Sequence, residues 1–583
     1  ALFSYDYYVS SANILNKEYN QYRYDESSGL YTKYVRQSPN SIERQTYMKS
    51  QMLGQISLNY DQTFAGRHKI NAFLVWETQK KNSDNFFAKR DLALPLEYLF
   101  AGIAENQQAT MNAASDGLYI NANNALAGKL NYALSNKYLA EFLFRYDSSS
   151  KFAPGHQWGF FPAASVGWRI SEENFFRELE GLSFVNQMKL RASYGVSGDD
   201  SASSYQFISG YNYPTGSDRR NFTGGYVYDG SFVASADNKG IPNPQITWFT
   251  AKTFDIGVDF DGWNGLFGLT LDYFSRVRDG LLATRSGGIP TVVGAGLPQE
   301  NLNGDRTFGL ELELTHRHKI GDFSYNAKAI ASVTRIKRLY VERGAIGSSW
   351  DNWKNNQNNR LQGVHSGYQG TGRFESWEDI WSYPVYIGRG TILGDYKYED
   401  WNGDGEINGS DSHPIRFNQY PWMNYSLILN GAYKRFDFDL LLQGATMSSL
   451  IYGEQLREPL WGSGDSSAMT QFLDRWHPVD PTADPYDPAT QWVSGHFAYT
   501  GSLPDTNSSF NAEDGAYLRL KSIELGYTFP AFFGVKNLRA FANAYNLFTI
   551  TKVRYIDPEH PNDTYGYLYP LNKSYSVGLN ITF

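Results

Sequence analysis

Cysteine is absent from this sequence of 583 residues. Without thiols, the chain cannot carry a disulfide framework, a thiolate nucleophile or a cysteine-ligated zinc ion. The absence does not identify the cellular compartment, although it suits a chain that crosses an oxidising periplasm while unfolded.

The sequence also lacks a hydrophobic stretch long enough for a membrane helix. Even with serine and threonine counted as permissible, the longest apolar or small run extends from Ser286 to Pro298. It is interrupted by glycine and proline and is shorter than the ~20 residues that a membrane helix needs. The chain starts at Ala1 without a basic and apolar leader, so we expect that an upstream segment was removed or is not included.

Charge is scarce as well, at 19% of the residues against ~25% in typical soluble chains. The net charge of -8 provides none of the clustered lysine and arginine that a nucleic-acid partner requires. Serine-hydrolase elbows, phosphate loops and His-Glu-x-x-His motifs are missing too. His316 and His318 lie two residues apart without a third ligand, which is more typical of surface residues than of a metal site. We therefore expect neither nucleic-acid binding nor an enzyme.

Aromatic residues are abundant at 16%, and apolar and polar residues alternate along many segments. The clearest case is Ser574 to Phe583, where five large apolar side chains occupy one face and small or polar ones the other. The segments 267–273, 307–317 and 522–529 show the same alternation. A period of two residues predicts strands with one apolar and one wet face, so that carboxylates such as Glu311 face the wet side.

The lengths of these strands and of their connections favour an all-β fold, a transmembrane antiparallel β-barrel. The strands run for about ten or more residues, as tilted membrane strands do, and short turns alternate with long connections. We expect residues 1–583 to form one barrel portion with about sixteen strands, and residues 339–420 and 444–516 to form long extracellular loops. The competing interpretation, a multidomain β-sandwich, would require short linkers between modules of similar size.

One segment has the spacing of a calcium-binding loop. Oxygen-bearing side chains occupy positions 1, 3, 5, 7, 9 and 12 of the loop, with Gly405 at the sharp turn of position 6. The candidate ligands are Asp400, Asn402, Asp404, Glu406, Asn408 and Asp411. Position 12 is Asp where a bidentate Glu is usual, and the flanks are not helical, so this is not an EF-hand. The alternative is a turn stabilised by its own side chains without a metal.

Nine of the fourteen tryptophans lie between residues 339 and 516. Exposed indole rings suit stacking on sugars or anchoring a protein partner, whereas buried ones pack the loops together. The candidates for ligand or lid contact are Trp350, Trp353, Trp377, Trp381, Trp461, Trp476 and Trp492.

Several stretches in order along the chain carry a family resemblance. They are Tyr146-Asp-Ser-Ser-Ser-Lys-Phe-Ala-Pro-Gly, Trp158-Gly-Phe-Phe-Pro-Ala-Ala, Met188-Lys-Leu-Arg-Ala-Ser-Tyr-Gly, Asn243-Pro through Asp255-Ile-Gly-Val-Asp-Phe, Gly394-Asp through the acidic loop, and Tyr517-Leu-Arg-Leu-Lys-Ser with Ala544-Tyr-Asn-Leu-Phe-Thr. With them, the chain resembles the barrel portion of a SusC-like (SusC/RagA) TonB-dependent transporter of the Bacteroidetes-type outer membrane. The final Phe583 with Tyr575 resembles the C-terminal signal that directs barrel assembly.

The resemblance implies an importer of bulky nutrients, most often oligosaccharides and sometimes peptides. It further implies a SusD-like surface lipoprotein as a lid, energy from the TonB complex and association of two transporter–lid pairs. Such barrels have ~22 strands, an N-terminal plug and a TonB box. Because the sequence shows neither plug nor TonB box, we expect those parts and the first strands to lie outside it. A peptide importer, a passive porin and a surface adhesin remain alternatives.

Overall fold

The computed structural model describes residues 1–111, 118–212, 225–234, 237–287, 290–344, 347–386, 391–461, 466–499, 507–531, 534–560 and 565–583. Parts of both long predicted loops, residues 345–346, 387–390, 462–465 and 500–506, lie outside these ranges. Among the described residues, no helix combines the length and apolar character needed to span a bilayer.

One sheet of 18 strands dominates the structure. Sixteen of them form its wall: β1 (Leu2–Asn16), β4 (Asn40–Phe64), β5 (His68–Leu92), β7 (Tyr119–Leu134), β8 (Tyr138–Ser149), β9 (Trp158–Arg169), β10 (Val185–Asp199), β15 (Phe249–Gly262), β16 (Phe267–Thr284), β17 (Gln299–Ile320), β18 (Phe323–Tyr340), β25 (Met423–Tyr433), β26 (Phe436–Thr446), β31 (Tyr517–Phe529), β32 (Asn537–Tyr545) and β34 (Ser574–Thr582). The other two, β6 (Gly102–Thr110) and β33 (Thr549–Thr551), pair with the outer ends of β5 and β31. The expected number of about sixteen therefore matches the wall strands.

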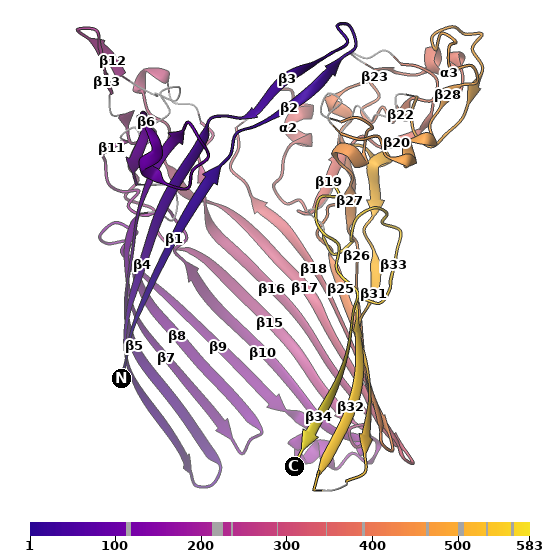
Figure 1. Cartoon of the computed structure of the whole chain (residues 1–583). Coiled ribbons are helices and arrows are strands. Elements are labelled where there is room, and N and C mark those ends of the chain that lie inside the picture. Colours follow the sequence, from indigo (N-terminus) through magenta and orange to yellow (C-terminus); the bar gives the residue numbers. More distant parts are fainter. Residues whose placement is uncertain are drawn as a thin grey trace.

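Each wall strand pairs antiparallel with the next one along the chain, from β1 with β4 through to β32 with β34. The sheet curves strongly, and β1 and β34 are its two edges (Figure 1). No strand pairing joins these two edges, although every residue of both is described. The wall is therefore a barrel that is open along one side.

The connections differ between the two ends of the wall. Short turns at residues 65–67, 135–137, 263–266, 321–322 and 434–435 lie at the lower end in Figure 1. The long connections at residues 341–422 and 447–516 lie at the upper end. This confirms the alternation of short and long connections expected from the sequence.

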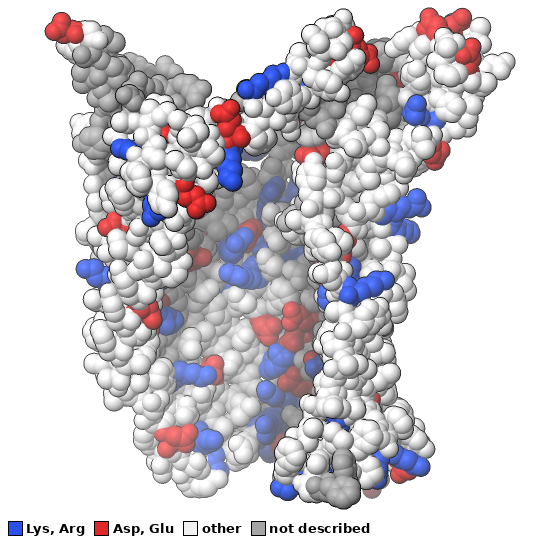
Figure 2. Space-filling model, viewed as in Figure 1, with Lys and Arg blue, Asp and Glu red and all other residues white. Residues whose placement is uncertain are grey.

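The two faces of the wall also follow the predicted alternation. Leu310 and Leu525 on the apolar face are 52% and 58% exposed, whereas Asp272 on the polar face is buried among its neighbours. Figure 2 shows acidic and basic side chains together on the wall of the hollow, seen through the opening. The polar face therefore lines the interior and the apolar face points outward.

Small elements at the upper end build the outer loops. Helices there are α2 (Ser349–Lys354) and α3 (Trp377–Ser382), and α1 (Asn174–Arg177) lies at the lower end. The paired strands are β2 (Tyr19–Asp25) with β3 (Leu30–Gln37), β11 (Tyr211–Asn212) with β14 (Asp237–Asn238), β12 (Gly225–Tyr228) with β13 (Ser231–Ala234), β19 (Val364–Gly367) with β24 (His413–Phe417), β20 (Gly370–Arg373) with β22 (Tyr396–Tyr398), β21 (Val385–Tyr386) with β23 (Glu406–Ile407), β27 (Ser449–Ile451) with β30 (Ala512–Asp514), and β28 (His477–Pro478) with β29 (Trp492–Val493).

The assignment of the two faces predicts opposite effects for neighbouring substitutions on β16. Leu271→Arg places a charge on the outward face and we expect it to lower the free energy of unfolding by about 2–4 kcal/mol in lipid. Thr270→Arg places the same charge on the inner face near Asp259, so we expect a much smaller change. Urea unfolding in phospholipid vesicles measures both values, and equal losses would show that the faces are assigned wrongly.

Candidate functional site

The inner wall is lined by ion pairs that neutralise its charges locally. Arg191 on β10 contacts both carboxylate oxygens of Asp272 at 2.6 Å and lies 3.3 Å from Asp259. Lys328 pairs with Glu313 at 2.7 Å between β18 and β17. These pairs make the wall hydrophilic and compatible with water. Among the side chains of these pairs, no nucleophile lies beside a base.

Asp437, Asp439 and Glu524 form the only group of three acidic or histidine side chains in the described part of the chain whose oxygen or nitrogen atoms lie within 4.8 Å of one another. Arg539 lies among them, with its Nε 3.0 Å from one oxygen of Asp437 and its Nη2 2.8 Å from Glu524. The guanidinium therefore pairs with two of the three carboxylates, Asp437 and Glu524.

Three indole rings at the upper end form one cluster, the tryptophan cluster of Trp350, Trp353 and Trp401. On α2, the centroids of Trp350 and Trp353 are 5.2 Å apart, and Trp353 lies nearly parallel to Trp401 at 6.0 Å. Behind them, the imidazole of His413 stacks on Trp401 at 4.7 Å. Trp350 is 36% and Trp353 54% exposed, so the cluster presents rigidly supported rings to solvent.

The acidic loop at residues 400–411 holds Trp401 in this position. The buried carboxylate of Asp411 accepts hydrogen bonds from the main-chain N–H groups of Trp401 at 3.0 Å and of Asn408 at 2.8 Å. From α2, Lys354 donates to the carbonyl of Gly409, which joins the helix to the loop. The acidic loop thus supports the tryptophan cluster through Trp401 and through its contact with α2.

The predicted calcium ligands are brought together as a set of tight turns. Asp400 accepts hydrogen bonds from the N–H groups of Gly403 at 2.8 Å and Gly405 at 2.9 Å, both glycines having positive φ. Asn402 donates to Asp404 at 2.7 Å, Asn408 accepts from Ser410 at 2.8 Å, and Glu406 is exposed. Within this fully described loop, no three carboxylates converge within 4.8 Å. One oxygen of Asp400 and one of Asp411 each accept a second N–H bond, from Asp404 at 3.2 Å and from Asn402 at 3.3 Å.

The remaining predicted tryptophans lie outside the cluster. Trp377 and Trp381 form a separate pair on α3 with centroids 6.3 Å apart, and Trp381 is 69% exposed. Trp476 packs on Gly394, where an added Cβ would lie 2.3 Å from its Cγ. Trp492 contacts Tyr499 edge-on at 5.3 Å, and Trp461 lies in a turn. Trp476 and Trp492 therefore have evident packing roles.

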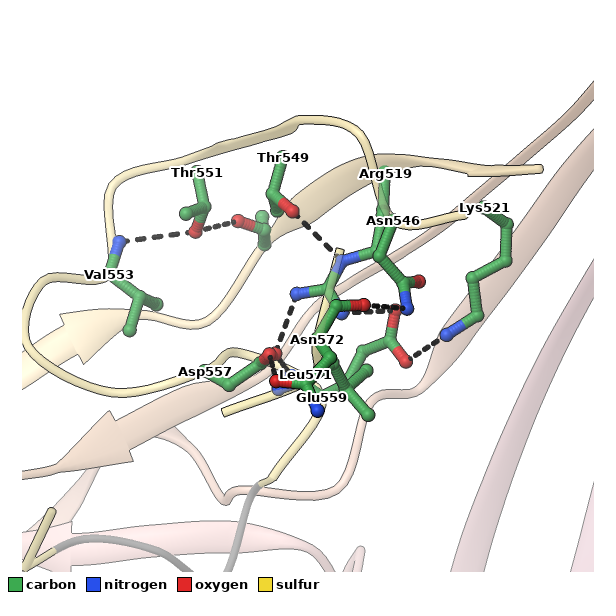
Figure 3. A network of polar contacts seen from close by, with 11 residues as sticks. Arg519, Lys521, Asn546, Thr549, Thr551, Val553, Asp557, Glu559, Leu571 and Asn572 are labelled. Carbon is green, nitrogen blue, oxygen red and sulfur yellow. Dashed lines mark hydrogen bonds and ion pairs between the residues drawn. The ribbon is translucent and has the colours of Figure 1, made fainter. Parts of the chain in front are cut away.

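A buried polar network, which we call the arginine clamp, fixes the connection between β33 and β34 (Figure 3). Arg519 on β31 contacts Asp557 at 2.6 Å, Thr549 at 2.8 Å and Glu559 at 3.3 Å, and Lys521 contacts Glu559 at 2.5 Å. The side chains of Arg519 and Asp557 are only 4% and 6% exposed.

The pKa of Asp557 reflects opposing effects. Burial raises it, but the N–H groups of Glu559 and Leu571 and the guanidinium of Arg519 together hold the pKa below its usual value. The carboxylate is therefore ionised near neutral pH and pairs with Arg519.

The arginine clamp could not be assigned from the sequence alone. Arg519 lies in Tyr517-Leu-Arg-Leu-Lys-Ser, a stretch that carries the family resemblance, and no separate role was expected for it. A signal was present, because Arg519 and Lys521 share a two-residue spacing with Asp557 and Glu559. Without the fold, nothing indicated that these two pairs face each other.

We expect Arg519→Met to destabilise the connection at residues 552–560 by about 3–5 kcal/mol, because it leaves Asp557 buried without its partner. Lys434→Met is the matched control, since its pair with Asp322 is exposed. Hydrogen exchange of the connection measures the opening. Equal hydrogen exchange in the Arg519→Met and Lys434→Met variants would contradict the role of the clamp.

The stability contributed by Asp557 in the native chain depends on pH. It is present above the unfolded aspartate pKa of ~3.9 and is lost as pH falls through the lowered pKa of the folded state.

Comparisons with known proteins agree with this architecture. Residues 2–547 match the family described as "TonB dependent receptor-like, beta-barrel". A TonB-dependent receptor of Formosa agariphila is 28% identical over 485 residues, covering 78% of this chain and 46% of the relative. The TonB-dependent receptor SusC of Bacteroides thetaiotaomicron is 26% identical over 477 residues, covering 78% and 43%. This chain thus spans about half the length of the curated relatives it matches.

Among solved structures, the RagAB peptide importer in its "open-open" state superposes with a TM-score of 0.71 at 16% identity, covering 100% of this chain and 59% of that one. At this identity, the superposition supports the fold alone. Together with the alternating wall and the match over most of the sequence, it leads to one conclusion: this chain belongs to the TonB-dependent receptor β-barrel family of the outer membrane, a class of receptors and transporters and not of enzymes.

Proposed function

We propose that this chain provides the barrel of a TonB-dependent importer of a bulky nutrient, with an oligosaccharide as the cargo. The tryptophan cluster carries the proposal. Trp350 and Trp353 are exposed at the end of the wall that holds the long connections, and Trp401 and His413 support them from behind. Flat, rigid aromatic rings suit the apolar faces of pyranose sugars, and their fixed position lowers the entropy lost on binding.

The inner wall suits a hydrophilic cargo. Its charged side chains are paired with one another, as Arg191 is with Asp272 and Lys328 with Glu313, so a passing sugar meets hydrogen-bonding groups without strong net charge. Such a wall offers a sugar weak binding at many positions, which favours passage of the sugar through the barrel over its retention.

The partners follow from the family. We propose that a SusD-like lipoprotein covers the end with the long connections, that the TonB complex supplies energy through a part of the protein outside this chain, and that two transporter–lid pairs associate. The similarity to the TonB-dependent receptor SusC supports the energy source, and the resemblance to SusC-like transporters supports the lid. A peptide cargo is the second candidate, since RagAB, on which this chain superposes, is a peptide importer.

Uptake by cells that produce the full-length protein tests the importer. We expect fluorescent linear hexasaccharides of glucose or xylose to enter only when TonB is intact, because this cargo requires energised opening. Trp353→Ala is expected to weaken binding about 10-fold or more, because it removes an aromatic anchor. Trp263→Ala, which removes a half-exposed ring at the opposite end, is the control.

A conductance measurement and other outcomes of the uptake assay identify the alternatives. Steady ion conduction by the full-length protein in a planar bilayer would indicate a porin. Binding without TonB-dependent uptake would indicate an adhesin, and uptake of peptides alone would indicate a peptide importer.

We further propose that a calcium ion stabilises the acidic loop. Its oxygen spacing supports the proposal, and so does the contact of the loop with Trp401, because a fixed loop would fix the tryptophan cluster. We expect calcium to slow proteolysis at residues 400–411 in the native protein and to have no effect in the Asp400→Ala/Asp404→Ala variant. If proteolysis at residues 400–411 is equally fast in EDTA and in calcium, no ion stabilises the loop. Its order would then come from the hydrogen-bonded turns alone.

A further inference from the structure

The wall strands β15 to β18, which lie side by side in Figure 1, carry a row of cations. Lys252 on β15 and Arg306 on β17 both lie opposite Val277 on β16. On the other side of Arg306, Lys337 of β18 lies directly opposite it. Arg335 is two residues before Lys337 and therefore on the same face of β18. We call Lys252, Arg306, Arg335 and Lys337 the cationic patch.

The cationic patch faces outward. Val277 is six residues after Leu271 on β16, and Arg306 is four residues before Leu310 on β17. Side chains separated by an even number of residues lie on the same face of a strand. Leu271 and Leu310 are exposed on the apolar face of the wall. The patch therefore shares the face that contacts lipid.

The height of the patch corresponds to the upper edge of the apolar band. At the end with the short turns, the ring centroids of Phe267 and Trp263 are 6.4 Å apart. Val277 follows Phe267 by ten residues, which is about 33 Å along a strand and about 25 Å in height at a tilt of ~40°. The outward apolar band of such barrels is ~25 Å tall and ends in aromatic girdles. Phe254 and Phe308 lie one position below the row, so the patch lies at the level of the lipid headgroups.

The cations of the patch lack the carboxylate partners that the inner face provides. On the inner face of the same strands, Arg278 pairs with Asp305 and Lys328 with Glu313. None of the four patch residues forms an ion pair with a carboxylate in the described part of the chain. Asp279, one position above the row on β16, is exposed and shares the outward face. One carboxylate does not balance four cations, so the patch keeps an excess of positive charge.

The two arginines of the patch are held in position and keep free donors. Arg306 donates from Nε to the hydroxyl of Ser275 at 2.9 Å and from Nη2 to the hydroxyl of Tyr273 at 3.0 Å. The guanidinium of Arg335 lies over the ring of Trp422 at 4.7 Å. A guanidinium has five N–H donors, and one that stacks on a ring keeps the donors at its edge available. Both arginines can therefore also bind an anion.

The two lysines have no partner among the described side chains. Lys252 is exposed and Lys337 is half-buried, and neither ammonium group has a hydrogen bond or an ion pair there. Arg306 and Lys337 lie directly opposite each other, and like charges in this arrangement destabilise a sheet. Lys252 and Lys337 are three strand spacings apart, about 14 Å, which two flexible lysines can bridge around one headgroup. A bound anion would remove the repulsion.

Position and charge together select the ligand. Clusters of lysine and arginine at the membrane surface attract anionic lipids, and arginine binds phosphate in a bidentate manner. A phosphorylated lipid supplies an anion at the height of the patch, and its acyl chains can lie on the apolar face below, beside Phe254 and Phe308. An acidic protein segment would supply only the anion. We propose that the cationic patch binds the phosphate group of a lipid in the outer leaflet.

The proposal goes beyond import of a cargo. It rests on the proposed function only in placing the end with the long connections outside the cell. The patch lies on the lipid side of the wall, whereas the cargo passes on the other side. Oligosaccharide uptake and lipid binding can therefore succeed or fail independently.

The probe is monophosphoryl lipid A, titrated into the full-length protein in dodecyl maltoside and followed by native mass spectrometry. We expect saturable binding that weakens about 10-fold or more in the Lys252→Gln/Lys337→Gln variant, since it loses two charge-assisted contacts. Neither ammonium group has a described partner, so folding is expected to persist, and heat-dependent gel mobility checks it.

The matched control is Lys80→Gln. Lys80 is an exposed lysine on β5, four residues after the exposed Trp76 and hence on the same outward face, but it lies away from the patch. We expect this substitution to leave the affinity for the lipid unchanged. Equal affinities of the control and the double variant would overturn the proposal.

Two further ligands make the test specific. The same lipid with its phosphate removed keeps the sugars and acyl chains, and inorganic phosphate keeps the anion alone. Equal binding of the dephosphorylated lipid would show that the phosphate is not recognised and would overturn the proposal. Inorganic phosphate that binds as tightly as the lipid would overturn it too, because the ligand would then be a free anion.

Hexaglutamate represents an acidic segment of a partner protein. If hexaglutamate binds to the patch and monophosphoryl lipid A does not, the patch is a protein contact and the lipid assignment is wrong. If the lipid binds more tightly than hexaglutamate, and its binding weakens with rising ionic strength, the lipid assignment is supported.

Discussion

Backbone hydrogen bonding in a medium without water is the constraint on which this structure depends. Inside a bilayer, every N–H and C=O group needs a protein partner, and an antiparallel wall in which each strand pairs with its neighbours meets that need. The consecutive pairing from β1 to β34 provides those partners everywhere except along the two edge strands. The same pleated geometry sends alternate side chains outward and inward, so the lipid-facing and water-facing surfaces arise from one pattern.

Local neutralisation keeps the inner face hydrophilic. The carboxylates on the wet face are matched across strands by arginine and lysine, as in the contacts of Arg191 with Asp272 and of Arg539 with Asp437 and Glu524. Cross-strand pairing keeps each charge hydrogen-bonded, and the wall remains hydrophilic without a large net field. The three-carboxylate cluster near the short turns follows the same logic, because an arginine lies among its members.

The outer end is built differently, by buried polar contacts that shape loops with little regular structure. Asp411 organises the acidic loop through main-chain N–H groups and thereby supports Trp401, while Arg519 anchors the last long connection through Asp557. These contacts join segments that are distant in the sequence. The same region also has a small hydrophobic cluster, formed by Tyr396, Tyr398, Ile407 and Ala498. The exposed rings of the tryptophan cluster depend on the support of the acidic loop.

The sequence by itself determined the wall: its strands, their two faces, the short and long connections and the family. A period of two residues is a local property, and alternation such as Tyr575, Val577 and Leu579 against Ser576 and Gly578 can be read without knowing any partner strand. It also indicated a tryptophan-rich outer region, but it could not separate Trp350 and Trp353 from Trp476, whose ring packs on Gly394. Only the tertiary structure decided which rings are exposed and that Arg519 faces Asp557 across 38 residues of chain. The reason is physical, because side-chain burial and ion pairing depend on distances between segments remote in sequence, whereas the alternation of a strand depends only on its own backbone.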